Sequence, residues 1–432
     1  MSPSETLSRL LRERQAELRL PSVSAAVTAA GKVVWEEAVG IADAETGVAP
    51  TPNTQYRVGS ITKTFTAAAV MALRDEGKLG LDDLLSAHVR EAEGSPLTLG
   101  RMLAHNSGIQ REVPGDVWVK LEFPQTPDEL VARLAEAEQV LEPGTHWHYS
   151  NLAFAALGEV VSRVSGRSAQ EFVEERFLRP LGLARTSWLR EEPAARGYYV
   201  DPFSDVLHAE AEVEHSGAAA PAGELWSTPA DLCRWADFLA GREAMHAVQV
   251  MVDAEHWTLA WGLGLMLHRR SERVLFGHDG AMPGFIASFA YDRTERRGAA
   301  VVANASTPAL GVTAIALDLV EAALEVYPAE PELWRPAAQP PAELEGVLGR
   351  WWSEGMEFTF RWRGRLEAVP EGPARITEPA VFEQEAPDRY RTVAGRERGE
   401  LLFLHRDNAG AVAELRWATY RFTRKPEVVS AS

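Results

Sequence analysis

The segment RVGSITKTFTAAAVMAL (residues 57–73) places a serine three residues before a lysine, at the start of an apolar run. The run from Phe65 to Leu73 has the length and composition of a buried helix. Side chains three residues apart on a helix share a face, at about 5–6 Å between Cβ atoms, so the Lys63 amine can reach the Ser60 hydroxyl. Lysine occurs only at positions 32, 63, 78, 120 and 425, and only Lys63 has a serine three residues before it.

Two interpretations fit this spacing. In the structural one, Ser60 is a small polar residue at a helix start and Lys63 is an ordinary cation one turn later. In the chemical one, Ser60 is a nucleophile and Lys63 its base, which requires a lowered lysine pKa and could not be achieved with arginine. A Ser-x-x-Lys motif is common by chance, so partner motifs have to decide.

Size and charge exclude several classes of function. With 432 residues, the chain has room for a large catalytic unit and an appendage, or for two to three units. Its net charge of -18 argues against nucleic acid as a partner. The N-terminus lacks the apolar core of a signal peptide, and no apolar run is long enough to cross a bilayer. We therefore predict a cytoplasmic protein without a membrane partner, in which the single cysteine, Cys233, is packed in the core.

Periodicity predicts an α+β architecture for residues 1–327. Residues 21–42 have the pattern of a hairpin that turns at Ala30-Gly31-Lys32. Helical patterns cover 127–138, 150–164, 168–178, 229–240 and 310–326. Strand patterns return over 258–267, 273–278, 284–292 and 298–304. Both ends of this unit are therefore expected to close one antiparallel sheet with helices packed against it.

The C-terminal part has a different composition. Residues 328–343 are rich in proline and predict a semi-rigid linker. Residues 344–426 contain short alternating runs separated by turn residues, which predict a small all-β barrel or sandwich. Core packing is the favoured role for its tryptophans, and a ligand cup is the alternative. These are Trp351, Trp352, Trp362 and Trp417.

Two further motifs could supply partners for Ser60 and Lys63. Tyr149-Ser150-Asn151 precedes a predicted helix; it either caps that helix or offers a phenol for proton relay and an amide for orientation. His278-Asp279-Gly280 ends a predicted strand, as a hairpin turn or as a sheet edge that binds substrate beside an oxyanion site. No HExxH or CxxC motif accompanies the histidines at 146 and 148, so no metal or cofactor is expected.

In this order, the three motifs resemble those of the serine β-lactamase and penicillin-binding protein superfamily: Ser-x-x-Lys, then Tyr-x-Asn, then His-x-Gly. The resemblance covers residues 15–326 and is supported by four landmark segments. It implies a β-lactamase/transpeptidase-like fold with a helical subdomain, followed by a barrel or lipocalin-like domain. The landmarks are RMLAHNSGI (101–109), PLGLARTSW (180–188), GELWSTPADLCRW (223–235) and WGLGLML (261–267).

The resemblance also implies a role for each motif residue. Ser60 is expected to be acylated, Lys63 to act as general base, and Tyr149 to return the proton to the leaving group and to activate the acceptor in deacylation. Asn151 is expected to orient Lys63 and the substrate carbonyl. The backbone N–H groups of Ser60 and Ala281 are expected to form the oxyanion hole.

The third motif points to the acyl donor. His278 and Gly280 are expected to bind substrate, but His278 replaces a lysine that contributes to recognising the β-lactam carboxylate. A histidine is shorter and mostly neutral at pH 7, so we expect absent or slow β-lactamase activity. Small esters, amides or peptides, including peptides with D-residues, are the expected substrates.

Three alternatives remain open at this point. The chain could be a D-amino-acid-specific peptidase or a weak β-lactamase, an acyltransferase, or a catalytically silent sensor that binds a ligand in the same cleft. The sequence predicts no oligomeric state.

Overall fold

The computed structural model describes residues 2–306, 309–331, 333–372 and 378–426. It divides into two compact units, Met1–Ala329 and Glu330–Ser432, which we describe separately. In the described residues, no helix combines the length and apolar character needed to cross a bilayer.

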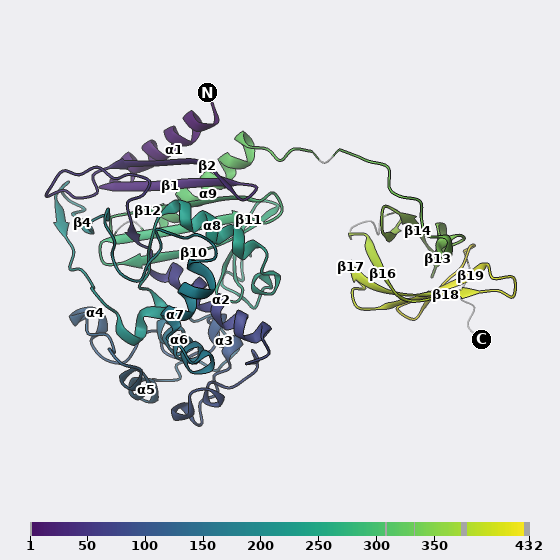
Figure 1. Cartoon of the computed structure of the whole chain (residues 1–432), viewed down its shortest axis with the longest axis horizontal. Coiled ribbons are helices and arrows are strands. Elements are labelled where there is room, and N and C mark those ends of the chain that lie inside the picture. The colour runs from purple at the N-terminus through teal and green to yellow at the C-terminus, as the bar shows by residue number, and fades with distance from the viewer. Residues whose placement is uncertain (1, 307–308, 332, 373–377, 427–432) are drawn as a thin grey trace. The chain divides into compact units, whose positions relative to one another are not determined.

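A mixed-length antiparallel sheet forms the centre of the first unit (Figure 1). In the described residues it has eight strands in the order β2-β1-β12-β11-β10-β9-β8-β7. The first hairpin lies beside β12, so the two ends of the unit close one sheet, as predicted. The strands are β1 (Ser22–Ala29), β2 (Lys32–Gly40), β7 (Val250–Met251), β8 (Leu259–Trp261), β9 (Met266–Arg270), β10 (Arg273–Met282), β11 (Phe285–Asp292) and β12 (Arg297–Ala303).

Alternation along the central strands separates two cores. On β12, Val301 packs with helices α1 (Pro3–Glu17) and α9 (Ala309–Val326) on one face of the sheet. Its neighbour Val302 belongs to the larger core on the other face. Successive side chains of a strand point to opposite faces, so an all-apolar strand such as β12 serves both cores. Cys233 lies in the larger core and is buried, as predicted.

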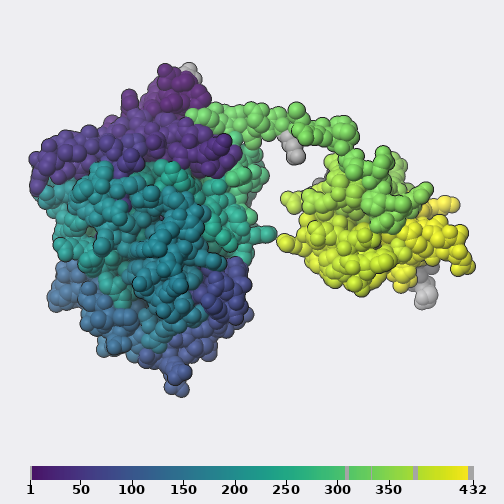
Figure 2. Space-filling view, in the orientation of Figure 1, coloured from purple at the N-terminus to yellow at the C-terminus, as the bar shows by residue number. Residues whose placement is uncertain are grey.

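A helical subdomain extends the larger core. Figure 2 shows its blue segments gathered at one end of the unit, with the purple N-terminal residues at the other. Helix α2 runs through this core, and nearly all of its side chains are buried. The helices of this face are α2 (Thr62–Asp75), α3 (Leu99–Leu103), α4 (Val117–Lys120), α5 (Pro127–Ala135), α6 (Asn151–Ser165), α7 (Ala169–Val173) and α8 (Pro229–Ala240).

The predicted strand over 258–267 is wrong in its continuity. It is split into β8 and β9 by a turn at Gly262 and Gly264. A Cβ at Gly262 would lie 2.2 Å from the Met245 carbonyl oxygen, and Gly264 has φ +75°. The two glycines therefore permit a close backbone approach and a turn, which apolar patterning does not reveal.

The second unit is a nearly closed antiparallel barrel, which confirms the predicted all-β fold. In its described residues, eight strands follow one another in sequence order, and a bridge between Trp352 and Thr423 joins the first strand to the chain just after the last. Trp351 is fully buried in its core. The strands are β13 (Gly349–Ser353), β14 (Met356–Trp362), β15 (Leu366–Pro370), β16 (Ala380–Ala386), β17 (Arg389–Ala394), β18 (Leu401–Arg406), β19 (Val412–Trp417) and β20 (Tyr420–Phe422).

Candidate active site

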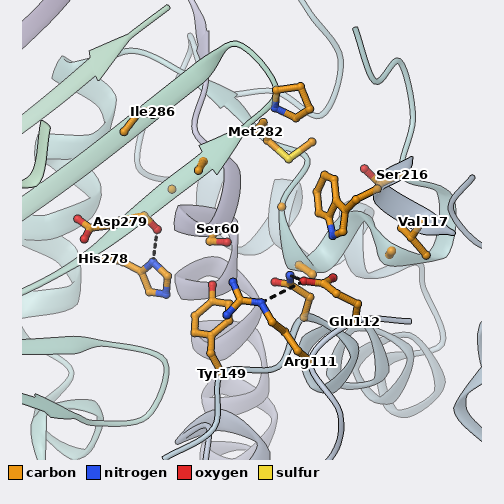
Figure 3. A pocket seen from close by; sticks show the side chains of 18 of the residues that line it. Ser60, Arg111, Glu112, Val117, Tyr149, Ser216, His278, Asp279, Met282 and Ile286 are labelled. Carbon is orange, nitrogen blue, oxygen red and sulfur yellow. Dashed lines mark hydrogen bonds and ion pairs between the residues drawn. The ribbon is translucent and has the colours of Figure 1, made fainter. Parts of the chain in front are cut away.

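Ser60 lies on a tight turn at the entry to helix α2. Gly59 has φ +49° and starts a 3-10 turn, Gly59–Ile61, that leads into α2 at Thr62. The Thr62 hydroxyl donates to the Gly59 carbonyl at 2.7 Å and accepts from Leu225 N–H at 3.1 Å, which fixes the turn. Ser60 remains partly exposed while its neighbours are buried. Its side chain therefore faces a pocket and does not cap the helix (Figure 3).

Lys63 reaches Ser60 as the sequence spacing predicts. Its Nζ donates to Ser60 Oγ at 2.9 Å and to the Ala222 carbonyl oxygen at 2.5 Å. The side chain is fully buried, and its Nζ lies 5.1 Å from the centre of the Tyr149 ring. Both hydrogen bonds hold the amine within reach of the serine hydroxyl proton.

Burial lowers the pKa of Lys63 to about 7. The nearby Glu112 carboxylate opposes this shift in the pKa, and the Arg111 guanidinium adds to it. The ordinary lysine pKa is 10.5, so an ordinary lysine is almost entirely charged at neutral pH, whereas the lowered pKa of Lys63 makes its uncharged amine accessible there. An uncharged amine beside a serine hydroxyl can act as a general base.

Tyr149 lies beside Ser60, with its hydroxyl directed toward the serine (Figure 3). Desolvation raises the pKa of Tyr149, and a hydrogen bond with Ser60 opposes that rise only in part. The phenol therefore keeps its proton at neutral pH and is a donor. Its ring stacks on His105 with centroids 4.1 Å apart, and the Arg111 guanidinium lies 5.1 Å from its centre.

His105 is buried beneath this ring and is held in one tautomer. Its Nδ1 accepts the Ser150 N–H at 3.0 Å, so the ring proton lies on Nε2. Burial and the charge on Lys63 lower the pKa of His105 well below its usual value. A neutral, packed imidazole therefore supports the Tyr149 ring.

Asn151 contacts a different residue from the one expected. Its Nδ2 donates to Glu112 Oε1 at 2.7 Å, and the same carboxylate oxygen lies 3.3 Å from Arg111 Nε. We expected Asn151 to orient Lys63, but among the described residues the Lys63 amine hydrogen-bonds to Ser60 Oγ and to the Ala222 carbonyl oxygen. The helix cap is Ser150, whose Oγ accepts from Ala153 N–H at 3.0 Å.

His278 reaches the pocket from strand β10 and is 2% exposed. Burial, with repulsion from Lys63, lowers its pKa to about 3. Its Nδ1–H donates to the Asp279 carbonyl oxygen at 2.5 Å, which leaves Nε2 as an acceptor. The side chain is therefore neutral throughout the physiological range of pH and brings no positive charge to the pocket.

Two glycines bring strand β10 against the Ser60 turn. A Cβ at Gly280 would lie 1.8 Å from the Val58 carbonyl oxygen and 3.1 Å from Ser60 N, and one at Gly59 would lie 2.7 Å from Ala281 N. Only residues without side chains allow this approach. It places the backbone N–H groups of Ser60 and Ala281 close together at the pocket, in the arrangement that can stabilise an oxyanion.

We expect Gly280→Ala to lower kcat/KM by about 100-fold or more, because the added methyl group must push β10 away from the Ser60 turn and separate the two N–H groups. Steady-state kinetics and the melting temperature measure the effect. Gly241→Ala is the matched control, since its Cβ would meet only the Phe238 carbonyl oxygen at 3.7 Å. Equal kinetics for both variants would contradict the proposed role of this approach.

The pocket has a volume of about 870 Å³, which is ample for a substrate larger than an acetyl ester. Polar groups gather around Ser60, and much of the remaining lining is apolar. In the described residues, no group of three potential ligands could hold a metal ion. The apolar lining residues are Val113, Val117, Trp118, Phe123, Trp147, Leu259, Trp261, Met266, Met282, Pro283 and Ile286.

Several pocket residues were not predicted from the sequence. Arg111 and Glu112 follow the landmark RMLAHNSGI within three residues, which is a signal that we did not use. No sequence feature could have identified the Ala222 carbonyl as a partner of Lys63, because every residue type carries a backbone carbonyl. Of the predicted residues, Ser60, Tyr149, Asn151, His278, Gly280 and Ala281 all line the pocket, and Lys63 lies directly behind Ser60.

Comparison with known proteins identifies the family. A family model described as Beta-lactamase matches residues 7–323. The chain belongs to the β-lactamase family. It is thus a member of a family of serine hydrolases that includes penicillin-binding protein homologues, and the resemblance noted in the sequence is confirmed. A second model, for a domain of unknown function (DUF7586), matches residues 340–424.

Individual relatives are similar over most of their length. The chain is 29% identical to penicillin-binding protein 4 of Amycolatopsis lactamdurans, over 78% of this chain and 95% of that protein. A D-stereospecific amidohydrolase from a Streptomyces species is 27% identical, with a TM-score of 0.61 over 73% of this chain and 97% of that one. An octameric penicillin-binding protein homologue from Pyrococcus abyssi shares the fold across 97% of this chain and 99% of that one, with 24% identity and a TM-score of 0.65.

Proposed function

We propose that this member of the family cleaves small esters, amides or short peptides through an acyl-enzyme on Ser60. The observation that carries the proposal is the 2.9 Å hydrogen bond between Ser60 Oγ and a buried lysine whose pKa is lowered to about 7. A base with a pKa near the working pH is the most effective for removing the serine proton.

Acylation follows from the positions of the groups. Lys63 takes the Ser60 proton as Oγ attacks the substrate carbonyl, and the N–H groups of Ser60 and Ala281 bind the oxyanion. Tyr149, which keeps its proton at neutral pH, donates it to the leaving group as the bond breaks. The Lys63 ammonium then returns a proton to Tyr149, so the neutral pair is restored.

Deacylation reverses these roles. Water enters in place of the leaving group, and Tyr149 passes its own proton to the uncharged Lys63 amine while it takes a proton from the water, whose hydroxyl attacks the acyl carbonyl. Collapse of the intermediate breaks the ester bond to Ser60 Oγ, which takes a proton from the Lys63 ammonium, and releases the acid. The chain's own residues supply every proton transfer in this cycle.

The pocket favours some acyl donors over others. His278 is neutral, so a substrate carboxylate gains no charge attraction from it, which supports slow turnover of β-lactams. The apolar lining residues favour a substrate with a hydrophobic acyl or side-chain group. Likeness to a D-stereospecific amidohydrolase adds support for amides of D-residues alongside esters.

A substrate panel tests the proposal. Wild-type protein is expected to form a fluorophosphonate adduct that peptide mass spectrometry locates on Ser60, and to hydrolyse p-nitrophenyl esters of hydrophobic acids. D- and L-alanyl and phenylalanyl p-nitroanilides, with nitrocefin as the β-lactam, then rank the donor classes. An adduct elsewhere, or turnover that survives complete modification of Ser60, would contradict the proposal.

Tyr149→Phe is expected to lower kcat by about 10² to 10³-fold, because the ring still stacks on His105 while the proton donor is lost. Pre-steady-state kinetics should show slowed acylation with amides more than with esters, whose leaving groups need less protonation. Tyr199→Phe, at an exposed position of strand β4 (Tyr198–Val200), is the matched control. Unchanged amide hydrolysis in Tyr149→Phe would remove Tyr149 from the mechanism.

A further inference from the structure

The barrel of the second unit contains a cavity of its own. Its volume is about 280 Å³, roughly nine times the ~30 Å³ that one water occupies in the liquid. That space suits a ligand of roughly ten non-hydrogen atoms. Strands β13, β14, β15, β16, β19 and β20 supply most of the lining, so the first and last strands of the barrel both contribute to it.

Aromatic rings form the inner part of the cavity. Trp417 and Phe422 are 5% and 2% exposed, and Phe358 meets both rings edge-on, at 6.3 Å and 5.1 Å between centroids. Trp417 is fixed by a hydrogen bond from Nε1 to Thr392 Oγ1 at 2.9 Å. The rings therefore form a rigid apolar surface suited to a flat hydrophobic group.

Ser353 supplies an unused polar group in this lining. The residue is 6% exposed, and within the described part of the chain its hydroxyl is buried without a hydrogen-bond partner. A buried hydroxyl without a partner costs about 1–3 kcal/mol. Because no hydrogen bond holds the Ser353 hydroxyl, it can turn toward a ligand at low cost.

The rim of the cavity is acidic. Among the residues that the structure describes, Glu354, Glu378 and Glu397 line it together with one cation, Arg396, which lies 3.6 Å from Glu397. Glu354 directly follows Ser353, so a negative charge and the free hydroxyl stand at the same edge. Such a rim repels carboxylates and attracts ammonium groups.

We propose that this cavity binds a small organic cation with an apolar body, of the class of aromatic primary amines. The flat group packs against Trp417, Phe358 and Phe422, and the ammonium group donates to Ser353 Oγ next to Glu354. Exposed Tyr420, which also lines the cavity, adds a ring face to the cation site. The site is independent of Ser60 and of the proposed hydrolysis.

The first test uses the full chain and 2-phenylethylammonium, followed by ligand-observed NMR titration. Neutral 2-phenylethanol and anionic phenylacetate share the ring and chain and differ in charge. The cation is expected to bind at least about tenfold more tightly than the anion, with an affinity that falls as salt is added. Equal or tighter binding of phenylacetate would overturn the charge assignment.

Variants locate the site. Ser353→Ala is expected to weaken binding about fivefold, the equivalent of one hydrogen bond, without lowering the melting temperature, because an unpaired buried hydroxyl is removed. Glu354→Gln should weaken binding about two- to threefold at low salt, and Glu383→Gln, on an exposed part of β16 away from the lining, serves as its control. If the role of Ser353 is purely structural, Ser353→Ala will lower the melting temperature and leave the affinity for 2-phenylethylammonium unchanged.

A photoreactive analogue, 2-(4-azidophenyl)ethylammonium, separates this cavity from the Ser60 pocket. Labelled peptides are expected within residues 349–422, and excess 2-phenylethylammonium should protect them. Labelling confined to residues 1–329 would overturn the proposal even if hydrolysis at Ser60 were established. Labelling of the barrel in a protein without hydrolytic activity would support the amine-binding cavity. In that case only the proposed hydrolase function would be wrong.

Discussion

Replacing Ser60 by alanine is expected to lower kcat/KM by on the order of 10⁴-fold or more. The substitution removes the proposed nucleophile, whose hydroxyl lies in the pocket beside Tyr149 (Figure 3). Hydrolysis of the best substrate from the panel, measured by steady-state kinetics, gives the ratio. Fluorophosphonate labelling should disappear in parallel.

The structure also predicts what Ser60→Ala leaves intact. Ser60 is partly exposed, and Lys63 keeps its hydrogen bond to the Ala222 carbonyl, so the melting temperature should change little. Ser95→Ala, in the same unit but outside the pocket lining, is the matched control and should retain activity. If Ser60→Ala hydrolyses the substrate at the wild-type rate, another residue is the nucleophile and the mechanism is wrong.

Lys63→Met is expected to lower kcat/KM by about 10² to 10⁴-fold, the range that a positioned general base contributes. Methionine fills a similar volume but cannot accept the serine proton. Lys32→Met, on an exposed position of β2, provides the matched lysine control. Activity of Lys63→Met close to that of the wild type would show that another group removes the proton.

The pH dependence of the wild type follows from the same residue. Lys63 must be uncharged to act as a base and its pKa is lowered to about 7, so kcat/KM should be low in acid and rise through about pH 7. Glu112 raises the pKa of Lys63, so Glu112→Gln should move this rise to lower pH. A profile that is flat between pH 5 and 9 would contradict the assignment of Lys63.

Stability provides a second readout with a defined sign. The pKa of Lys63 is about 7 in the fold and near 10.5 when unfolded, so the unfolded chain binds more protons between these values. Burial of Lys63 therefore destabilises the fold, and this destabilisation has its full size below about pH 7. It decreases as the pH increases from 7 to 10.5, so the free energy of unfolding rises over that range. Lys63→Met should remove this pH dependence, and its melting temperature at pH 7 should match or exceed that of the wild type.

Local patterns in the sequence were enough to predict the fold class and the order of the motifs. Periodicities of 2 and 3.6 residues are local, so the first hairpin, helix α8 and strands β11 and β12 were predicted close to their observed bounds. The contact between Ser60 and Lys63 could also be predicted locally, because the helical backbone fixes the separation of side chains three residues apart. The prediction failed at Gly262, where the strand is interrupted because the backbone of Met245, distant in the sequence, approaches closely. Local patterns do not record such a contact.

The protonation state of the site and the hydrogen-bond partners of its residues depend on tertiary contacts. The pKa of Lys63 is lowered because the fold buries its amine, and Asn151 binds Glu112 because the start of helix α6 meets a loop 39 residues away in the sequence. The same holds for the barrel cavity, where Ser353 and Phe422 come from strands far apart in sequence. Desolvation and hydrogen-bond pairing depend on which segments surround a group, and a sequence pattern records only the residues beside it along the chain.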